Sequence, residues 1–240
     1  MKIIYFDCTN GISGDMAYMA LQELLNDGHS HDHCHDHDHG HSHHHKHEHN
    51  DDHSHDHEHE HSHNHDHSHN AYSDVKSMII NSEISESAKE KALSIYSVIA
   101  KAEASVHGTT VEDVHFHEVG RKAAVENIIG VAVCIDTMGV EQVLCSEICD
   151  GTGFIECSHG TIPVPVPAVM AMRSESDLTF ITDGNIKTEM VTPSGLAILM
   201  GLGARYSNEI PQGEIVKKAT VFGKRKTGKD GGLTAYLMLL

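Results

Sequence analysis

The residues with the clearest chemistry are histidines crowded into one internal segment. Between His29 and His69 the chain has 21 of its 25 histidines, alternating with Asp, Ser, Glu and Asn. Neutral imidazole suits nickel, copper and zinc, and the Irving–Williams order favours nickel over manganese or iron. Neighbouring carboxylates can add ligands or orient the rings. We therefore expect the tract to capture divalent metal, through candidate ligands that include His31, His33, His35, His43, His44 and His45.

The tract also has plainer interpretations. An expression tag is one, although this segment is internal and interrupted by acids; a pH-responsive solubility segment is another, since histidine titrates near pH ~6.5. Cys34 is the one apolar residue in the window, so burial cannot offset the entropy of ordering it. We expect a disordered insert over residues 29–70, acting as a metal store or antenna and not as a catalytic centre.

A second metal-binding pattern is His115-Phe116-His117-Glu118. In extended chain His115 and His117 project from the same face and can chelate one ion, with Glu118 nearby. A chance pair on a surface strand is the alternative, but the apolar helix that follows favours a functional role. His159 is a further candidate ligand, or part of a plain turn. Four ligands at structural-zinc spacing are missing, which argues against a zinc ribbon.

The N-terminus reads as a strand, a glycine-containing loop and a helix. An apolar run ends at Asp7, and the loop that follows contains Gly11, Ser13 and Gly14. Backbone N–H groups of such a loop and the helix N-terminus favour an anion. Asp7 and Asp15 would then hold a metal bound to that anion; alternatively, Asp15 only satisfies the helix dipole.

A second potential anion site lies at a later helix start. Thr192 is suited to the N-cap and Pro193 to the first helical position, followed by Ser194 and Gly195. Glu189 lies just upstream. Near the C-terminus, the basic segment 223–229 is either a clamp for phosphate or carboxylate, or a solvated hairpin turn.

Regular elements must position these groups. Apolar periodicity and capping residues predict an α/β fold, a mixed sheet with helices in a single domain over 1–240, interrupted by the insert at 29–70. The prolines at 163, 165 and 167 exclude that segment from a central strand. The predicted strands are 2–7, 143–149, 154–157, 215–222 and 233–240. The predicted helices follow Asp15 and cover about 85–107, with Ser85 as N-cap, 121–138, with Gly139 as C-cap, and 196–202.

Composition excludes several classes of function. With 17 Lys+Arg against 35 Asp+Glu, the net charge of −18 repels nucleic acid. No apolar run approaches the ~18 residues of a membrane span. The apolar run at the N-terminus is too short for a signal peptide, because it already reaches an acid at Asp7. Six cysteines without a secretion signal indicate reduced thiols. We expect a cytoplasmic protein.

Four segments together resemble a known family. They occur in the right order, cover nearly all of the chain outside the tract, and are Asp7–Met16, His115–Gly120, Asp150–Ala168 and Glu189–Gly195. In this combination they are similar to the nickel insertion proteins of nickel-pincer nucleotide biosynthesis (the LarC family). A histidine-rich tract between the first and second segments is also typical of that family.

The resemblance implies an activity. It implies insertion of nickel into pyridinium-3,5-bisthiocarboxylic acid mononucleotide with CTP, forming Ni–S bonds and a Ni–C bond, so the chain would be part of a nickel chelatase or cyclometallase, a lyase. In the family a smaller C-terminal part binds CTP with a divalent cation. We therefore expect this chain to need a separate C-terminal polypeptide, or to be a fragment.

The sequence also departs from the family pattern. Ala123 and Asn127 stand where acids are usual, and Lys226 where an acid is common; lost carboxylates weaken a site for a hard cation. A non-catalytic nickel store or chaperone is therefore the alternative function. A zinc hydrolase lacks an identifiable third ligand and base. Strand order cannot be read from the sequence, and a homo-oligomer is left open.

Overall fold

The computed structural model describes residues 1–26, 70–157 and 160–240. The predicted insert lies almost wholly outside these residues. So do the ligands proposed in or near it, which stay predictions: His31, His33, His35, His43, His44, His45 and His159.

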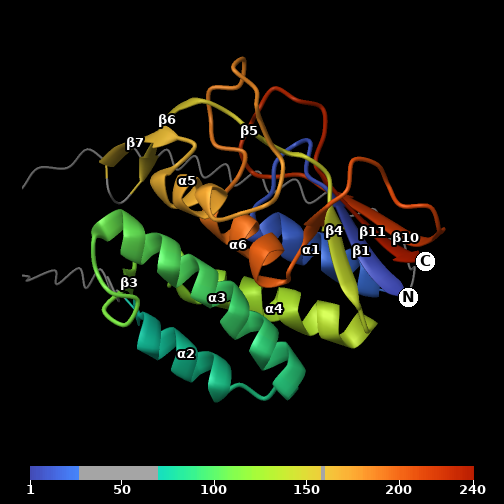
Figure 1. The fold of residues 1–240 in the computed structure, drawn as a ribbon, viewed down its shortest axis with the longest axis horizontal. Coiled ribbons are helices and arrows are strands. Elements are labelled where there is room, and N and C mark those ends of the chain that lie inside the picture. Colours follow the sequence, from blue (N-terminus) through green and yellow to red (C-terminus); the bar gives the residue numbers. More distant parts are fainter. Residues whose placement is uncertain (27–69, 158–159) are drawn as a thin grey trace, which may run out of the picture. The chain divides into compact units, whose positions relative to one another are not determined.

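A five-stranded mixed sheet forms the centre of the fold (Figure 1). Strand β1 (Lys2–Asp7) pairs antiparallel with β11 (Leu233–Leu239) and parallel with β4 (Gln142–Cys145). The edges are β10 (Glu214–Val221), antiparallel to β11, and β9 (Arg205–Tyr206), parallel to β4. The predicted α/β class with a mixed sheet is confirmed.

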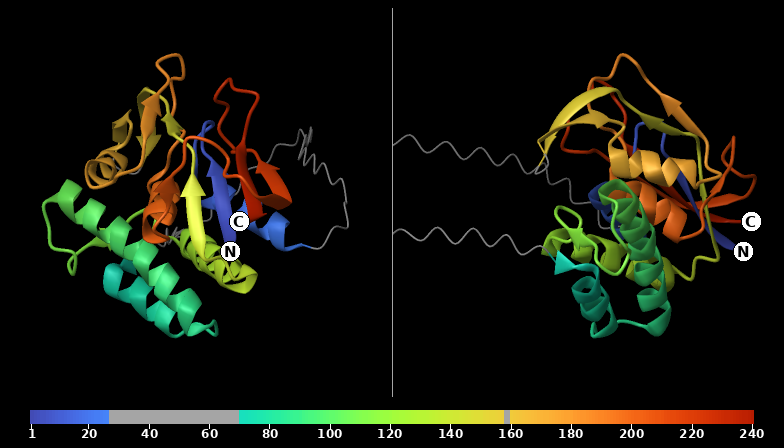
Figure 2. Two further views of the ribbon diagram at one scale, coloured as in Figure 1. Left: turned by 45° about the vertical axis from the view of Figure 1, so that its right-hand side comes forward. Right: turned by 60° about the vertical axis from the view of Figure 1, so that its left-hand side comes forward.

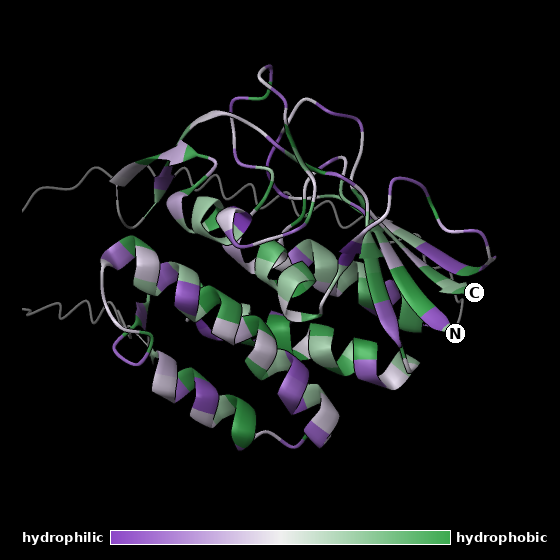
Figure 3. Ribbon diagram, in the orientation of Figure 1, coloured by the Kyte–Doolittle hydropathy of each residue, from purple (hydrophilic) through white to green (hydrophobic). Residues whose placement is uncertain are grey.

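The helices gather on one side of this sheet (Figure 2). Successive side chains of β1 point to opposite faces of the sheet. Ile4 and Phe6 pack in the main core with the helices, and Ile3 and Tyr5 belong to a small cluster on the other face. Figure 3 shows hydrophilic and hydrophobic residues together on the long helix α3, as expected of an amphipathic helix. The helices are α1 (Gly14–Leu25), α2 (Tyr72–Ile80), α3 (Glu86–His107), α4 (Lys122–Met138), α5 (Pro167–Ser174) and α6 (Pro193–Gly201).

The helix ends follow the predicted capping residues. The Ser85 hydroxyl accepts the N–H of Ala88 at the start of α3, and Gly139 ends α4 with a φ of 64°. Thr192 caps α6 through the N–H of Gly195. No helix in the described part of the chain is long and apolar enough to cross a membrane.

Three short strand pairs lie outside the central sheet: β2 (Asn70–Ala71) with β3 (His115–Phe116), β5 (Ile148–Asp150) with β8 (Phe180–Thr182), and β6 (Gly153–Cys157) with β7 (Gly160–Val164). The single strand predicted over 143–149 is wrong. The chain leaves the central sheet at Ser146, whose N–H donates to the Phe6 carbonyl and whose hydroxyl accepts the Cys8 N–H. The proline at 163 lies in a two-stranded hairpin, outside the central sheet as predicted.

Candidate functional site

The two predicted anion loops are joined into one structural unit. The Ile12 N–H donates to the Met190 carbonyl (2.9 Å), and the Thr192 N–H donates back to the Ile12 carbonyl (3.0 Å). A Cβ on Gly11, whose φ is +84°, would lie 2.3 Å from the Met190 oxygen, and one on Gly195 would lie 2.4 Å from the Ile12 oxygen. The starts of α1 and α6 can approach each other because both positions are glycine.

The glycines of the two predicted anion loops are therefore also required for packing. A Cβ on Gly14 would come within 2.8 Å of the Ser194 hydroxyl. Gly11, Gly14 and Gly195 line neither of the two cavities described below. Their role in binding a ligand stays a prediction.

Asp150 anchors the segment that leads into α6. Its Oδ1 accepts the N–H groups of Gly151 (2.8 Å), Met190 (3.0 Å) and Val191 (3.2 Å). The residue is fully buried, and its Oδ2 has no hydrogen-bond partner among the described residues. Burial raises the pKa of Asp150, against the opposing effect of these N–H donors. The sequence analysis placed this residue at the start of a family-like segment but predicted no role for its side chain.

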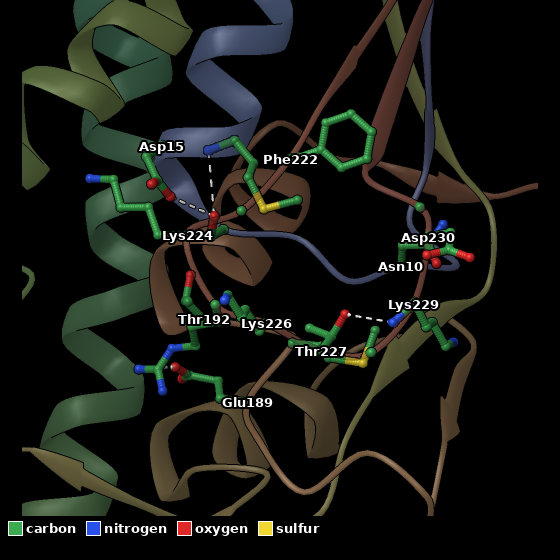
Figure 4. A pocket seen from close by; sticks show the side chains of 17 residues that line it. Asn10, Asp15, Glu189, Thr192, Phe222, Lys224, Lys226, Thr227, Lys229 and Asp230 are labelled. Atoms are coloured by element: carbon green, nitrogen blue, oxygen red, sulfur yellow. Dashed lines mark hydrogen bonds and ion pairs between the residues drawn. The ribbon is translucent and has the colours of Figure 1, made fainter. Parts of the chain in front are cut away.

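The first cavity, of about 470 Å³, lies between the helix starts and the loop that joins β10 to β11 (Figure 4). Ser13, Asp15 and Thr192, three of the predicted site residues, line it. In Figure 4 Lys224 lies on the side of Asp15, and Lys229 lies on the opposite side with Asn10 and Asp230. The predicted basic segment thus faces the predicted anion loops across one space.

The cations of this loop differ in how far they are neutralised. The Lys229 amine lies 3.6 Å from the Asp183 carboxylate and donates to the Thr9 carbonyl (3.2 Å). Lys224 and Lys226 are exposed and form no ion pair with any residue that the structure describes. The cavity therefore holds positive charge that a bound anion can neutralise.

The two aspartates predicted to hold a metal, Asp7 and Asp15, have different surroundings. Asp15 lies in the first turn of α1, accepts the Ser13 hydroxyl (2.5 Å) and lines the first cavity. Asp7 accepts the Thr9 N–H (3.1 Å) and hydroxyl (2.6 Å), and lines neither cavity. Of the two carboxylates only that of Asp15 lines a cavity, and its position also suits the helix dipole. The metal role predicted for the pair stays a prediction.

The second cavity, of about 390 Å³, contains the other predicted group. His117, Glu118, Thr192 and Ser194 line it, together with Cys157 and several apolar side chains. His107 at the end of α3 also lines it, which the sequence analysis missed. The rings of His107 and His117 have centroids 6.1 Å apart, and His107 Nε2 lies 3.3 Å from the Glu103 carboxylate. The sequence signal for His107 is that it follows Glu103 by four residues on the same helix, a spacing that brings two side chains together.

His115 lies apart from this cavity. It is exposed on β3, and its Nδ1 donates to the Asp113 carbonyl (2.9 Å). The chain leaves the extended conformation after Phe116, so the expected common face for His115 and His117 does not continue. Within the described residues, no group of three or more His, Cys, Asp or Glu side chains is arranged to hold a metal ion.

Glu189, Thr192 and Arg225 line both cavities and so form the wall between them. The Glu189 side chain is only 6% exposed, and Arg225 Nη2 lies 3.1 Å from its Oε2. Burial is the main reason that the pKa of Glu189 is raised to about 7; Arg225 opposes this rise, and Asp150 and Glu118 add to it. The shared wall therefore carries a carboxyl group that exchanges protons near neutral pH.

Comparison with known proteins identifies the family. The family model described as "Nickel insertion protein" matches residues 4–237, nearly the whole chain. The chain belongs to the nickel insertion protein family. The resemblance inferred from the four sequence segments is thus confirmed.

Several relatives of this family carry more specific names. A pyridinium-3,5-bisthiocarboxylic acid mononucleotide nickel insertion protein of Acetivibrio thermocellus is 36% identical over 99% of this chain and 60% of the relative. One of the same name from Lactiplantibacillus plantarum is 36% identical over 68% of this chain and 39% of the relative. A putative nickel insertion protein of Enterococcus faecalis is 41% identical over 66% of this chain and 48% of the relative. The chain thus spans 60% or less of these relatives, and no solved structure matches it.

Proposed function

We propose that this chain binds pyridinium-3,5-bisthiocarboxylic acid mononucleotide and holds it while nickel is inserted, in a CTP-dependent reaction that needs a second polypeptide. The observation that carries this proposal is the pair of cavities meeting at Glu189 and Arg225. One cavity suits a phosphate, and the other suits an organic ring and a soft metal. A mononucleotide with sulfur substituents on its ring presents both kinds of group, and the relatives' printed names point to this substrate.

The first cavity would hold the phosphate of the mononucleotide. Lys224 and Lys226 supply charge that no ion pair with a described residue neutralises. The N-termini of α1 and α6 lie at the same cavity through Ser13 and Thr192. Helix starts and lysines both favour an anion, and together they fit a phosphate better than either would alone.

The second cavity would hold the pyridinium ring and receive nickel. Its walls include apolar side chains such as Val119 and Ile162, which suit a flat ring. The imidazoles of His107 and His117 and the Cys157 thiol lie on the same walls, and both donor types bind nickel readily. Nickel is a substrate here, delivered from the histidine tract and passed on to the ring sulfurs.

The substrate's own substitution pattern indicates the chemistry. Sulfur groups on ring positions 3 and 5 flank carbon 4, so a nickel ion bound to both sulfurs is held against that carbon. Formation of a Ni–C bond there makes the reaction a cyclometallation, which corresponds to a nickel chelatase of the lyase class. CTP with its divalent cation would be bound mainly by the second polypeptide, whose counterpart is the part of the longer relatives that this chain does not cover.

A reconstitution assay tests this proposal. The full chain is mixed with nickel, CTP, magnesium and the dithiocarboxylate nucleotide, with and without the uncovered portion of the Acetivibrio thermocellus relative. We expect the metallated product, identified by mass and absorbance, when both polypeptides are present. Absence of product under every condition would overturn the proposal.

Nickel storage without catalysis is the second candidate, and the 21 clustered histidines favour it. Deletion of residues 29–69 separates the two functions. An insertion enzyme should lose nickel stoichiometry yet keep its turnover at saturating nickel. Tight nickel binding without product in any mixture would instead support storage. Capture should weaken as pH falls in either case, because imidazole ligands must be deprotonated.

A further inference from the structure

We propose that Glu189 accepts the proton that leaves ring carbon 4 as nickel bonds to that carbon, an inference that rests on the proposed function. Neither sequence nor family comparison assigned Glu189 a role; its position does. Among the described carboxylates, Glu189 alone lines both the cavity that suits the phosphate and the cavity that suits the ring. A substrate that spans the two cavities must pass this side chain.

The step balances without a further reagent. The electron pair of the C4–H bond becomes the Ni–C bond, and the proton moves to a Glu189 carboxylate oxygen. Nickel enters and stays as Ni²⁺, so no oxidant or reductant is required. Both sulfurs hold the metal against the carbon, and a carboxylate placed beside them takes the proton as the new bond forms. Glu189 then releases this proton to solvent or to a neighbouring group.

The surroundings of Glu189 suit a base that works near neutral pH. Its pKa of about 7 reflects burial first, then the opposing charge of Arg225, and then the negative charges of Asp150 and Glu118. General bases are most effective when their pKa lies near the working pH. A carboxylate with an ordinary pKa would be a weaker acceptor for a carbon-bound proton, and a fully protonated one could accept none.

The other carboxylates near the cavities are placed less well. Asp15 lines the first cavity only, and its carboxylate accepts the Ser13 hydroxyl. Asp150 lines neither cavity, and one of its oxygens accepts three backbone N–H groups. Glu118 lines the second cavity only, which makes it the principal rival to Glu189.

The test uses the two-polypeptide assay with substrate carrying deuterium at carbon 4. Wild-type protein should release this deuterium as product forms. Glu189→Gln should lower kcat by at least about 100-fold, the usual minimum for a lost general base, with little change in KM. The deuterium should stay on the substrate while nickel and nucleotide still bind. Glu175→Gln, a substitution at an exposed acid at the end of α5, is the matched control and should behave as wild type.

Two further measurements guard against a merely structural effect. Glu189→Asp keeps a carboxylate and should retain part of the activity. The wild-type kcat/KM should fall below pH ~7, where a base with that pKa is protonated in the protein without substrate, and the residual activity of Glu189→Gln should not follow this fall. If the Glu189→Gln variant does not fold, the Glu189→Asp variant and the wild-type pH–activity profile test the inference instead. A wild-type activity that does not change with pH around ~7 overturns the inference.

The outcomes separate the inference from the proposed function. Wild-type turnover with an equally active Glu189→Gln variant overturns the inference alone. The same holds if Glu118→Gln stops deuterium release while Glu189→Gln does not. If the wild-type pair of polypeptides forms no product, the proposed function fails and the inference fails with it.

Discussion

The Arg225 guanidinium lies 3.1 Å from the Glu189 carboxylate, although only the glutamate is buried. Arg225 is half exposed and lies on the basic loop that faces the first cavity, so a phosphate bound there would compete with Glu189 for the same guanidinium. Substrate binding would then weaken the one interaction that lowers the pKa of Glu189. The pair would therefore link phosphate binding in the first cavity to the proton affinity of Glu189, which lines both cavities.

Substitution of Arg225 by Gln tests this link. Without the guanidinium, burial and the neighbouring acids act unopposed, so the pKa of Glu189 rises above about 7. The acid side of the pH–activity profile should move to higher pH, with activity lost at neutral pH and recovered in alkali. Titration of isotope-labelled glutamate carboxyl carbons by NMR measures the pKa directly. An unchanged Glu189 titration would show that the ion pair has no influence in solution.

Stability should depend on pH through the same residue. The pKa of Glu189 is about 7 in the folded chain against an ordinary value of 4.5, so the folded chain binds the extra proton between these values. Rising pH through this window therefore destabilises the fold, by about 3 kcal/mol at most. Glu189→Gln removes the dependence, so its unfolding free energy relative to wild type should increase from pH 4 to pH 8. Denaturant unfolding at both values checks this, with Glu175→Gln expected to show no such trend.

Local features of the fold could be predicted from the sequence, and long-range pairings could not. Ser85, Gly139 and Thr192 act at the helix ends where they were expected, because a cap contacts backbone only a few residues away. The Glu189–Arg225 pair joins residues 36 positions apart, from different elements. Nothing in the local pattern of either segment specifies this meeting.

The candidate site shows the same division. The loops after β1 and before α6 were both identified as anion sites, since each has the composition of a helix start. The backbone hydrogen bonds that join them at Ile12 and Met190 could not be foreseen. The common face expected for His115 and His117 assumed a longer strand, whereas β3 ends at Phe116. The metal role of this histidine pair remains a prediction.

Gly11→Ala should disrupt the junction of the two loops. The new Cβ would lie 2.3 Å from the Met190 carbonyl oxygen, at a φ of +84° that side chains rarely adopt. We expect a loss of about 3 kcal/mol or more in unfolding free energy. Gly108→Ala is the matched control, because its φ is +63° but its Cβ would meet nothing within 4 Å. That control should cost only the ~1–2 kcal/mol of the backbone conformation. Equal losses in the two variants would show that the close approach is unimportant.

Asp150 offers a test of how the segment before α6 is held. Asp150→Ala removes the acceptor of three backbone N–H groups in a fully buried position. Buried donors without partners cost about 1–3 kcal/mol each, so unfolding free energy should fall by ~3 kcal/mol or more. Asp150→Asn keeps one acceptor oxygen and should lose about half as much. Chemical denaturation of both variants compares the two, and an alanine variant no less stable than the asparagine one contradicts this account.

The basic loop should determine affinity for the phosphorylated substrate. The double variant Lys224→Ala with Lys226→Ala removes the two cationic groups that line the first cavity without an ion pair to any described residue. A charged hydrogen bond contributes ~1.5 kcal/mol or more, so the dissociation constant for the mononucleotide should rise by about tenfold for each lysine that contacts the phosphate.

Because these side chains are exposed, the wild-type affinity should also weaken with added salt, more steeply than that of the double variant. Lys101→Ala, on the exposed side of α3, is the control for charge alone. Isothermal titration at two salt concentrations measures both effects, and equal affinity in all three proteins would place the phosphate elsewhere.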